Sequence, residues 1–318
     1  MPARITLTRA SLVPLDNVLG TWLIGLILSS VLFGVTCLQM FLYFTRYSSH
    51  DHRFLKAFVV SLLILDSLHL ALVSHSLYSV VVTNFGDYVE LETIPWSLLV
   101  QTFVGAFLGT MVQLFYGWRI YILSKKSAVL PTFIGISAVA GLVLAALWTH
   151  KSFELKLFKF ADRLAVLSAV GLAFGATADL LIAGSMIYHL SKNRTGFQKT
   201  NKAISKLVAY SVSTGALTSV CAIGNVIAEN ISPSTLDFVP FFFILIRLHC
   251  LSFMSILNSR DHIREQLDAA SSHAMVTIPS YPIVNLMEPG ASDIDGAKHH
   301  EGHVPMTNMS LLSRSVDL

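Results

Sequence analysis

The stretch VLGTWLIGLILSSVLFGVTCLQMFLYF, residues 18–44, decides the fold of this chain. It runs for 27 residues without a charged side chain. About 20 apolar residues in an α-helix cover the roughly 30 Å hydrocarbon core of a bilayer. Because a backbone in lipid must satisfy its hydrogen bonds within its own segment, this stretch predicts a transmembrane helix.

The composition of the whole chain agrees with a bilayer setting. Its 318 residues are 53% hydrophobic and 13% charged, with a mean hydropathy of +0.64, which is more apolar than a soluble domain needs for its core. The net charge of +3 is small, and the basic residues collect in short segments between apolar runs. We therefore expect the lipid bilayer as a partner and no nucleic acid.

Six further apolar segments continue the pattern. With 18–44, the predicted spans are 57–82, 97–123, 128–149, 164–190, 207–229 and 238–258. No alternation of period two runs through them, which argues against a porin-like barrel. The prediction is an all-α polytopic membrane protein. A seven-helix bundle covers residues 18–260, a polar segment precedes it at 1–17, and a largely disordered tail follows at 261–318.

Loop charge predicts the orientation of the bundle, because Lys and Arg in short loops favour the cytoplasmic side. The loops after the first, third, fifth and seventh spans, counted together with the adjoining ends of those spans, hold three, three, five and two basic residues, thirteen in all, against six on the other side. The thirteen are Arg46, Arg53, Lys56, Arg119, Lys125, Lys126, Lys192, Arg194, Lys199, Lys202, Lys206, Arg260 and Arg264. The N-terminus is therefore expected outside and the C-terminus in the cytoplasm.

The loop after the fifth span, KNRTGFQKTNKAISK at 192–206, carries the largest group of basic residues. Such a cluster beneath a membrane is attracted to anionic lipid, and a cytoplasmic protein is a second candidate partner. The alternative is that the loop determines topology and does nothing more. Asn193 begins a glycosylation sequon, but on the cytoplasmic side it is expected to stay unmodified.

From Ala178 the sequence ADLLIAGSMIYHLSKNRTGFQKTNKAISKLVAYSVSTGALTS contains three recognisable patterns. They are Ala-Asp-x-Leu-Ile-Ala from Ala178, Arg-Thr-Gly-Phe from Arg194, and Thr-Gly-x-Leu-Thr-Ser from Thr214. With them the chain resembles a large family of fungal multi-pass membrane proteins that carry a domain of unknown function, typical of mushroom-forming basidiomycetes. The resemblance spans about residues 15–260 and implies a seven-helix integral membrane protein. It implies no activity, ligand or reaction.

Charged residues near the centres of spans are the candidate functional residues, because each costs about 2.5 to 3.5 kcal/mol to insert at mid-bilayer. Asp66, Asp179 and Arg247 have this position, so Arg247 is expected to pair with one or both aspartates. His69 follows Asp66 by three residues and shares its helix face, and His249 is a further candidate. The five residues form the predicted polar core, whose alternative role is a structural clamp between helices.

Small residues spaced by four also mark two of the spans. Gly105 and Gly109 lie in the third span, and Gly171, Gly175 and Asp179 lie in the fifth. This spacing lets helix backbones approach closely. If the stripe in the fifth span faces the bundle axis, it turns Asp179 away from lipid.

No motif predicts a catalytic residue, a metal or a cofactor. His69, His189 and His249 lie on different spans without a His partner four residues away, unlike the paired histidines of zinc sites on helices. The seventh span has no lysine that could hold retinal. Three functions stay open: a receptor-like or sensory protein, a transporter of a small solute or protons, and a membrane-embedded hydrolase. Plasma membrane and endomembrane are both possible locations.

Overall fold

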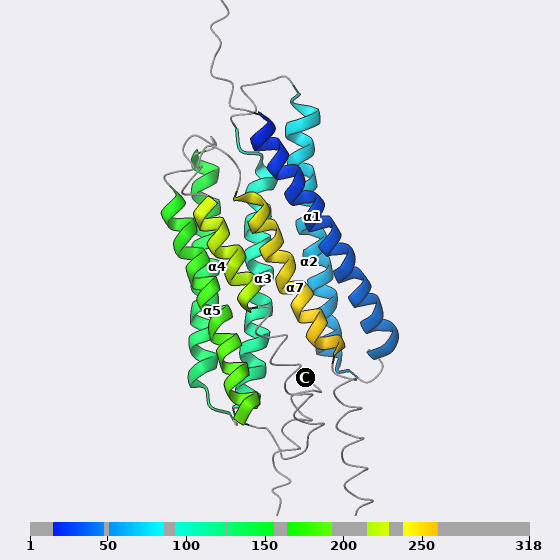
Figure 1. Ribbon diagram of the computed structural model, residues 1–318, viewed down its shortest axis with the longest axis vertical. Helices are drawn as coiled ribbons and strands as arrows, with labels where there is room; N and C mark the ends of the chain where they lie inside the picture. The colour runs from blue at the N-terminus through cyan, green and yellow to red at the C-terminus, as the bar shows by residue number, and fades with distance from the viewer. Residues whose placement is uncertain are drawn as a thin grey trace, which may run out of the picture.

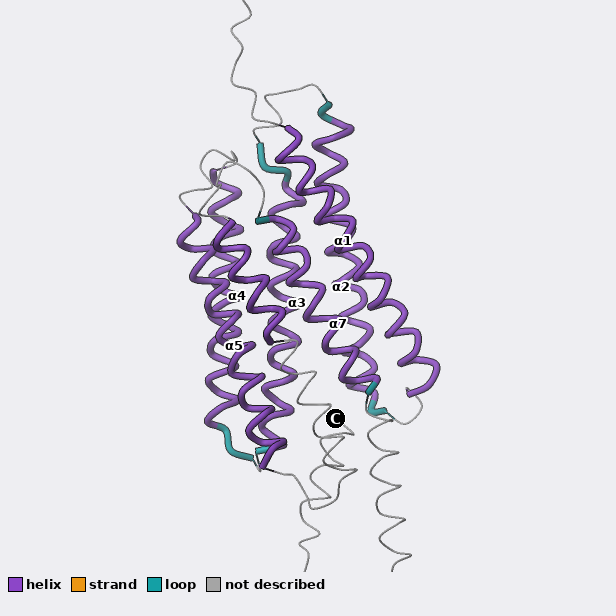
Figure 2. The backbone as a smooth tube through the Cα atoms, viewed as in Figure 1, coloured by secondary structure: helices purple, strands orange, loops and turns teal. Residues whose placement is uncertain are grey.

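The computed structural model describes residues 15–47, 51–85, 93–124, 126–155, 164–192, 215–228 and 238–259. Over these residues the fold is all-α, with no β-strand among them (Figure 2). The long helices are α1 (Leu15–Leu42), α2 (Arg53–Tyr78), α3 (Trp96–Leu123), α4 (Val129–Leu155), α5 (Ala165–Lys192) and α7 (Val239–Asn258). Turns of π-helix extend α1 over Tyr43–Tyr47 and α2 over Ser79–Thr83.

Within the described part of the chain, six helices are long and apolar enough to cross a membrane. A seventh, shorter apolar helix covers Gly215–Ala228, inside the predicted span at 207–229. The remainder of that span lies outside the described residues, as do residues 1–14 and the tail from residue 260. The structure therefore supports a multi-pass membrane protein, while the count of seven spans and the orientation stay predictions.

The helices extend beyond the apolar segments from which they were predicted. α2 begins at Arg53 rather than at residue 57, and α4 ends at Leu155 rather than at residue 149. The extra turn of α4 carries charged side chains, and Lys151 Nζ lies 2.8 Å from Glu154 Oε2 with both groups more than half exposed. Polar residues beyond the apolar run can still form helical backbone hydrogen bonds. The length of the apolar run therefore underestimates the length of the helix.

The bundle is centred on α3 and α7 (Figure 1). In each of these two helices 56% of the most apolar segment is buried, against 17% in α4 and α5. α1 and α2 lie on one side of this centre, and α4 and α5 lie on the other (Figure 1). The Gly215–Ala228 helix lies between α5 and α7, because its Gly215 is against Ala183 and its Gly224 is against Phe241.

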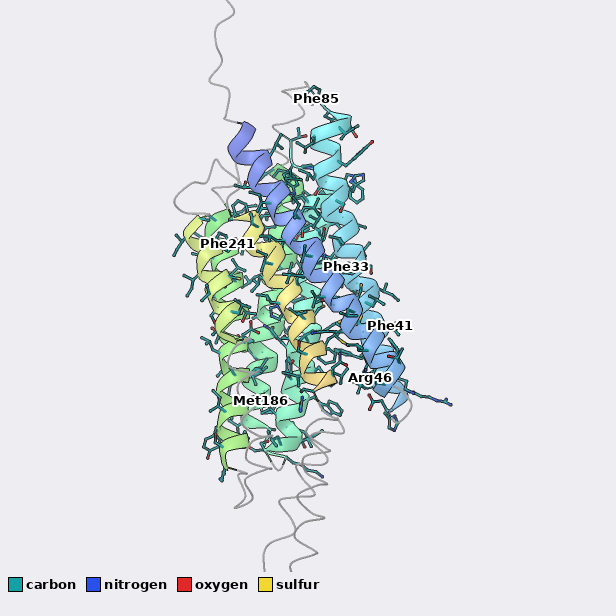
Figure 3. All side chains as sticks on the ribbon, turned by 45° about the vertical axis from the view of Figure 1, so that its right-hand side comes forward. Phe33, Phe41, Arg46, Phe85, Met186 and Phe241 are labelled. Carbon is teal, nitrogen blue, oxygen red and sulfur yellow. The ribbon has the colours of Figure 1, made fainter. Side chains whose placement is uncertain are left out.

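Large apolar side chains cover the outside of the bundle (Figure 3). Val31 and Phe41 of α1 and Phe133 of α4 are each about 60% exposed, which in water would be a large apolar surface but in a bilayer contacts lipid. Arg46 lies at one end of the bundle and Phe85 at the opposite end (Figure 3). Such an apolar surface along the helices is what a membrane-spanning bundle requires.

The small residues predicted to allow close packing occupy close helix contacts. A Cβ atom at Gly141 of α4 would lie 3.5 Å from both the Gly171 carbonyl oxygen and the Gly175 nitrogen of α5. A Cβ at Gly105 of α3 would overlap the Ile246 side chain of α7. The stripe in α5 therefore faces the bundle, and it turns Asp179 inward, where 11% of that side chain is exposed.

Candidate functional site

Arg247 lies at the middle of α7 and is fully buried. Its Nη1 donates to the Asp66 carboxylate and, at 2.9 Å, to the Asp66 carbonyl oxygen. Its Nε donates to Ser29 Oγ at 2.9 Å, and its guanidinium carbon lies 5.4 Å from the centre of the Phe33 ring. This arginine cluster joins α1, α2 and α7, and it shows that Arg247 pairs with Asp66.

His69 completes the arginine cluster. Its Nδ1 lies 3.1 Å from Arg247 Nη2. Because a guanidinium can only donate, Nδ1 must accept, and His69 is therefore a neutral imidazole with its proton on Nε2. The cluster holds one cation and one carboxylate, so its charge is balanced within the membrane interior. Such pairing is what makes buried ions tolerable there.

A second polar cluster forms around Asp179 at the middle of α5. The Gln113 amide nitrogen donates to Asp179 Oδ1 at 2.8 Å and to the Gly175 carbonyl oxygen at 3.1 Å. His249 Nε2 lies 3.3 Å from Asp179 Oδ2. This aspartate cluster joins α3, α5 and α7 and lies on the other side of α7 from Arg247.

The proton on His249 can be assigned from its partners. Nδ1 lies 2.9 Å from the Leu245 carbonyl oxygen, which can only accept, so Nδ1 carries a proton. An Nε2 lone pair and a carboxylate would repel each other at 3.3 Å unless a proton lay between them. Asp179 and His249 therefore share one further proton, and together they carry no net charge.

The structure divides the five predicted core residues between these two clusters. Asp66, His69 and Arg247 belong to the arginine cluster, and Asp179 and His249 belong to the aspartate cluster. Arg247 and His249 are two residues apart, which is about 200° around an α-helix. One polar core was expected, but α7 separates two, because neighbouring positions of a helix cannot face the same partner.

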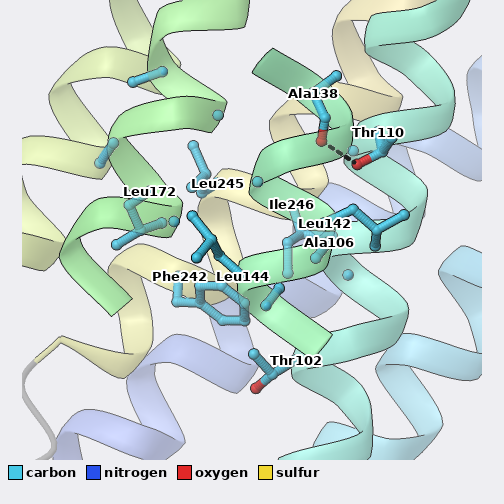
Figure 4. Close-up of a pocket in the computed structure, with 18 of the residues that line it drawn as sticks. Thr102, Ala106, Thr110, Ala138, Leu142, Leu144, Leu172, Phe242, Leu245 and Ile246 are labelled. Carbon is cyan, nitrogen blue, oxygen red and sulfur yellow. Dashed lines mark hydrogen bonds between the residues drawn. The ribbon is translucent and has the colours of Figure 1, made fainter. Parts of the chain in front are cut away.

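A cavity of about 150 Å³ lies between α3, α4, α5, α7 and the Gly215–Ala228 helix. Figure 4 shows its apolar lining, in which Leu144 and Leu142 come from α4, Leu172 from α5, and Phe242 and Ile246 from α7. It reaches from near the starts of α3, α5 and α7 to the aspartate cluster. Since a water needs about 10 to 15 Å³ measured in this way, the cavity has room for a small organic molecule.

A smaller cavity of about 30 Å³ lies against the other side of the aspartate cluster. Gln113, Asp179 and His249 line both cavities, and Tyr116 and Ser252 line only the smaller one. This space is large enough for about two waters and has enough polar groups to bind them. The aspartate cluster therefore stands between two spaces in the bundle.

The sequence did not identify Gln113, Ser29 or the cavity. Gln113 lies four residues after Gly109, on the same face of α3, and an uncharged polar residue continuing a small-residue stripe was the available signal. Ser29 gave no signal, because hydroxyl residues in membrane helices commonly bond their own backbone, as Ser30 does with the Leu26 carbonyl oxygen.

The structure describes little of the predicted basic loop. Of the predicted basic loop, Lys192 is described at the end of α5, with Nζ 5.8 Å from the centre of the Tyr188 ring. Arg194, Lys199, Lys202 and Lys206 lie outside the described residues. Among the described residues no three His, Cys, Asp or Glu side chains converge as metal ligands would.

The fold and the two buried polar clusters define a multi-pass α-helical membrane protein with a cavity inside its bundle. Residues 175–262 match the model of a family of unknown function (DUF6534). This segment includes Asp179, Arg247 and His249, and so it contributes to both clusters. Neither the curated proteins nor the solved structures that were compared with the chain gave a match.

Proposed function

We propose that this chain is a receptor-like or sensory membrane protein of seven transmembrane helices, and that its ligand occupies the cavity of about 150 Å³. The observation that carries the proposal is the position of the aspartate cluster at one end of a mostly apolar cavity. Apolar walls with a few convergent polar groups are typical of small-molecule sites. The fungal origin implied by the resemblance stays a prediction.

The helices around the cavity supply a way for a ligand to act on the rest of the protein. A ligand shifts a conformational equilibrium only if it binds one state better than another. α7 contacts the cavity through His249 and holds α1 and α2 through Arg247. A ligand that moves α7 would therefore change the contacts between the two halves of the bundle.

The proposed orientation places the N-terminus outside and the tail in the cytoplasm. In that orientation α3, α5 and α7 begin at the outer face. Thr102, Leu167 and Phe242 line the cavity near those helix starts, and Asp179 and His249 lie near the middle of the membrane. The basic loop at 192–206 and the tail then lie at the face where a signal would be read out.

Filling the cavity tests the proposal. Gly175 lines the cavity, and a Cβ added there meets no atom within 4 Å, so Gly175→Leu should occupy the space without a clash at its first atom. Gly184→Leu is the matched control, because Gly184 lies on the same helix, is exposed, and also has open space at its Cβ.

The measurement has two parts, both on purified full-length protein in lipid nanodiscs. Small apolar fragments, with benzene as the first probe, should raise the Tm of the wild type and of Gly184→Leu but not of Gly175→Leu. Hydrogen exchange in segment 193–214 should change when a fragment binds. A Tm shift that is equal in all three proteins, or binding without any change in exchange, would contradict a receptor-like role for the cavity.

Transport is the second candidate function, and the two cavities on opposite sides of the aspartate cluster favour it. Asp179 and His249 share a proton, and groups of this kind relay protons in membrane pumps. Protein in sealed liposomes with an internal pH dye would report proton movement. Movement that Asp179→Asn abolishes would replace the receptor proposal. No observation within the described part of the chain favours the third alternative, a membrane-embedded hydrolase.

A further inference from the structure

The hydrogen-bond donors at the aspartate-cluster end of the cavity already face acceptors. The Gln113 amide has two N–H groups, and it donates to Asp179 Oδ1 and to the Gly175 carbonyl oxygen. His249 Nδ1 donates to Leu245, and the Thr218 hydroxyl donates to Gly215 at 3.2 Å. To bind at the aspartate cluster, a ligand group that only accepts hydrogen bonds, such as a ketone or an ether, would therefore have to displace one of these contacts.

The Asp179 carboxylate, in contrast, can accept a further hydrogen bond. A carboxylate offers about four acceptor positions, and the groups near Asp179 are Gln113, His249 and Thr218. Even if all three donate, one position is left. Since 11% of the Asp179 side chain is accessible and the residue lines the cavity, a donor on a ligand can reach it.

The net charge of the site determines which polar group of a ligand binds best. Asp179 and His249 together are neutral, so an ammonium group would give up its hydration and gain no net counter-charge. A carboxylate would face Asp179 without a free donor to stabilise it. A hydroxyl group is neutral, donates one hydrogen bond, and loses far less on leaving water than an ion does.

The rest of the cavity is long and mostly apolar. Along α5 its lining extends from Leu167 to Asp179, which at 1.5 Å per residue is about 18 Å. Leu144, Leu172, Phe242 and Leu245 lie along this length. A cavity of comparable volume in another protein holds benzene, so a flexible chain of on the order of eight carbon atoms fits the volume and the length of this cavity.

We infer that the ligand is an elongated apolar alcohol, an inference that rests on the proposed ligand site. The hydroxyl of the alcohol donates to the Asp179 carboxylate, and its hydrocarbon chain fills the cavity toward the outer end of the bundle. Asp179 is then the residue that determines specificity. Gln113 and His249 are positioning residues, because each holds the carboxylate and leaves an acceptor position open.

The test compares four probes of equal chain length on full-length protein in nanodiscs: 1-octanol, n-octane, octanoic acid and octylamine. The affinity for each probe is taken from the Tm shift as a function of probe concentration. Binding in the cavity is the part of the Tm shift that is lost in Gly175→Leu and retained in Gly184→Leu, and only this part is used. A hydrogen bond to a charged acceptor corresponds to roughly tenfold or more in affinity. We expect 1-octanol to bind about tenfold more tightly than n-octane and more tightly than the acid or the amine.

Two variants locate the hydroxyl. Asp179→Asn has the same shape, and its amide nitrogen can donate to His249 while its oxygen accepts from Gln113, so the preference for 1-octanol over n-octane should fall to about threefold or less. Gly109→Ala leaves the charges intact and places a methyl group 4.0 Å from the His249 ring. Because Gly109 lines the cavity beside His249, this methyl group takes up space next to the aspartate cluster and should reduce the same preference. The test therefore does not depend on one variant folding well.

The outcomes separate this inference from the proposed function. Octane and octanol binding equally, or the acid or the amine binding more tightly than octanol, would overturn the alcohol and leave the ligand cavity standing. A preference for octanol that survives both Asp179→Asn and Gly109→Ala would overturn the role of Asp179. If no probe binds in a way that Gly175→Leu prevents, the cavity is no ligand site and both proposals fail.

Discussion

The pairing of Arg247 with Asp66 can be tested by a double-mutant cycle. Arg247→Met removes the guanidinium from a site where both partners are 0% exposed, leaving the Asp66 carboxylate without a cation and His69 Nδ1 without its donor. Breaking a buried ion pair from one side costs about 3 to 5 kcal/mol. Protonation of Asp66 would recover part of that loss.

Asp66→Asn should be costly for the same reason, because it leaves the Arg247 charge unbalanced. The double variant Asp66→Asn with Arg247→Met has no unpaired charge, so it should be more stable than the sum of the single losses predicts, by about 2 to 3 kcal/mol. Asp179→Asn with Arg247→Met is the control. Asp179 lies in the other cluster, so its loss and that of Arg247 should add.

The assay is thermal unfolding of detergent-solubilised protein followed by tryptophan fluorescence. About 1 kcal/mol shifts Tm by about 2 to 4 °C for a protein domain of 150 to 250 residues, so either single variant of the ion pair should lower Tm by about 10 °C. The reasoning fails if Asp66 and Arg247 give additive losses, or if Asp179 and Arg247 give the larger coupling.

Three further predictions address the topology, the packing and the loop. A tag at Leu318 should be protected from protease in sealed cells while a tag at Met1 is cleaved, and the reverse pattern would refute the orientation. Gly105→Ala should destabilise the protein by about 1 to 3 kcal/mol through overpacking against α7, whereas alanine at Gly34, which has open space, should leave Tm nearly unchanged. Changing the lysines at 192–206 to glutamine should weaken binding to anionic vesicles relative to neutral ones, and unchanged binding would leave the loop as a topology determinant alone.

The sequence was sufficient to predict the helices because their signal is local. The length and polarity of a run such as residues 18–44 can be read from that segment alone, and α1 includes nearly all of it. The ends were less predictable, since Arg53 and Glu154 are helical although they are polar. Backbone hydrogen bonding, which side-chain polarity does not report, decides where a helix ends.

For the candidate site, the sequence predicts which residues take part but not how they pair. Mid-span charge identified Asp66, Asp179 and Arg247, because insertion into a bilayer is costly for any charge wherever its partner lies. Which aspartate receives the arginine depends on the order and rotation of α2, α5 and α7 in the bundle, and these are set by packing over the whole length of each helix. The cavity depends on the same packing, and no single residue signals it.

The opposite directions of Arg247 and His249 restrict how α7 can move. Turning α7 about its own axis would withdraw both side chains from their partners at once and leave polar groups facing hydrocarbon on two sides. Tilting α7 as a lever about the arginine cluster keeps one set of contacts while the other opens. With Arg247 as the pivot, His249 lies only two residues, or about 3 Å of helix rise, from it. A small opening at the aspartate cluster therefore becomes a larger displacement at the far ends of the helix.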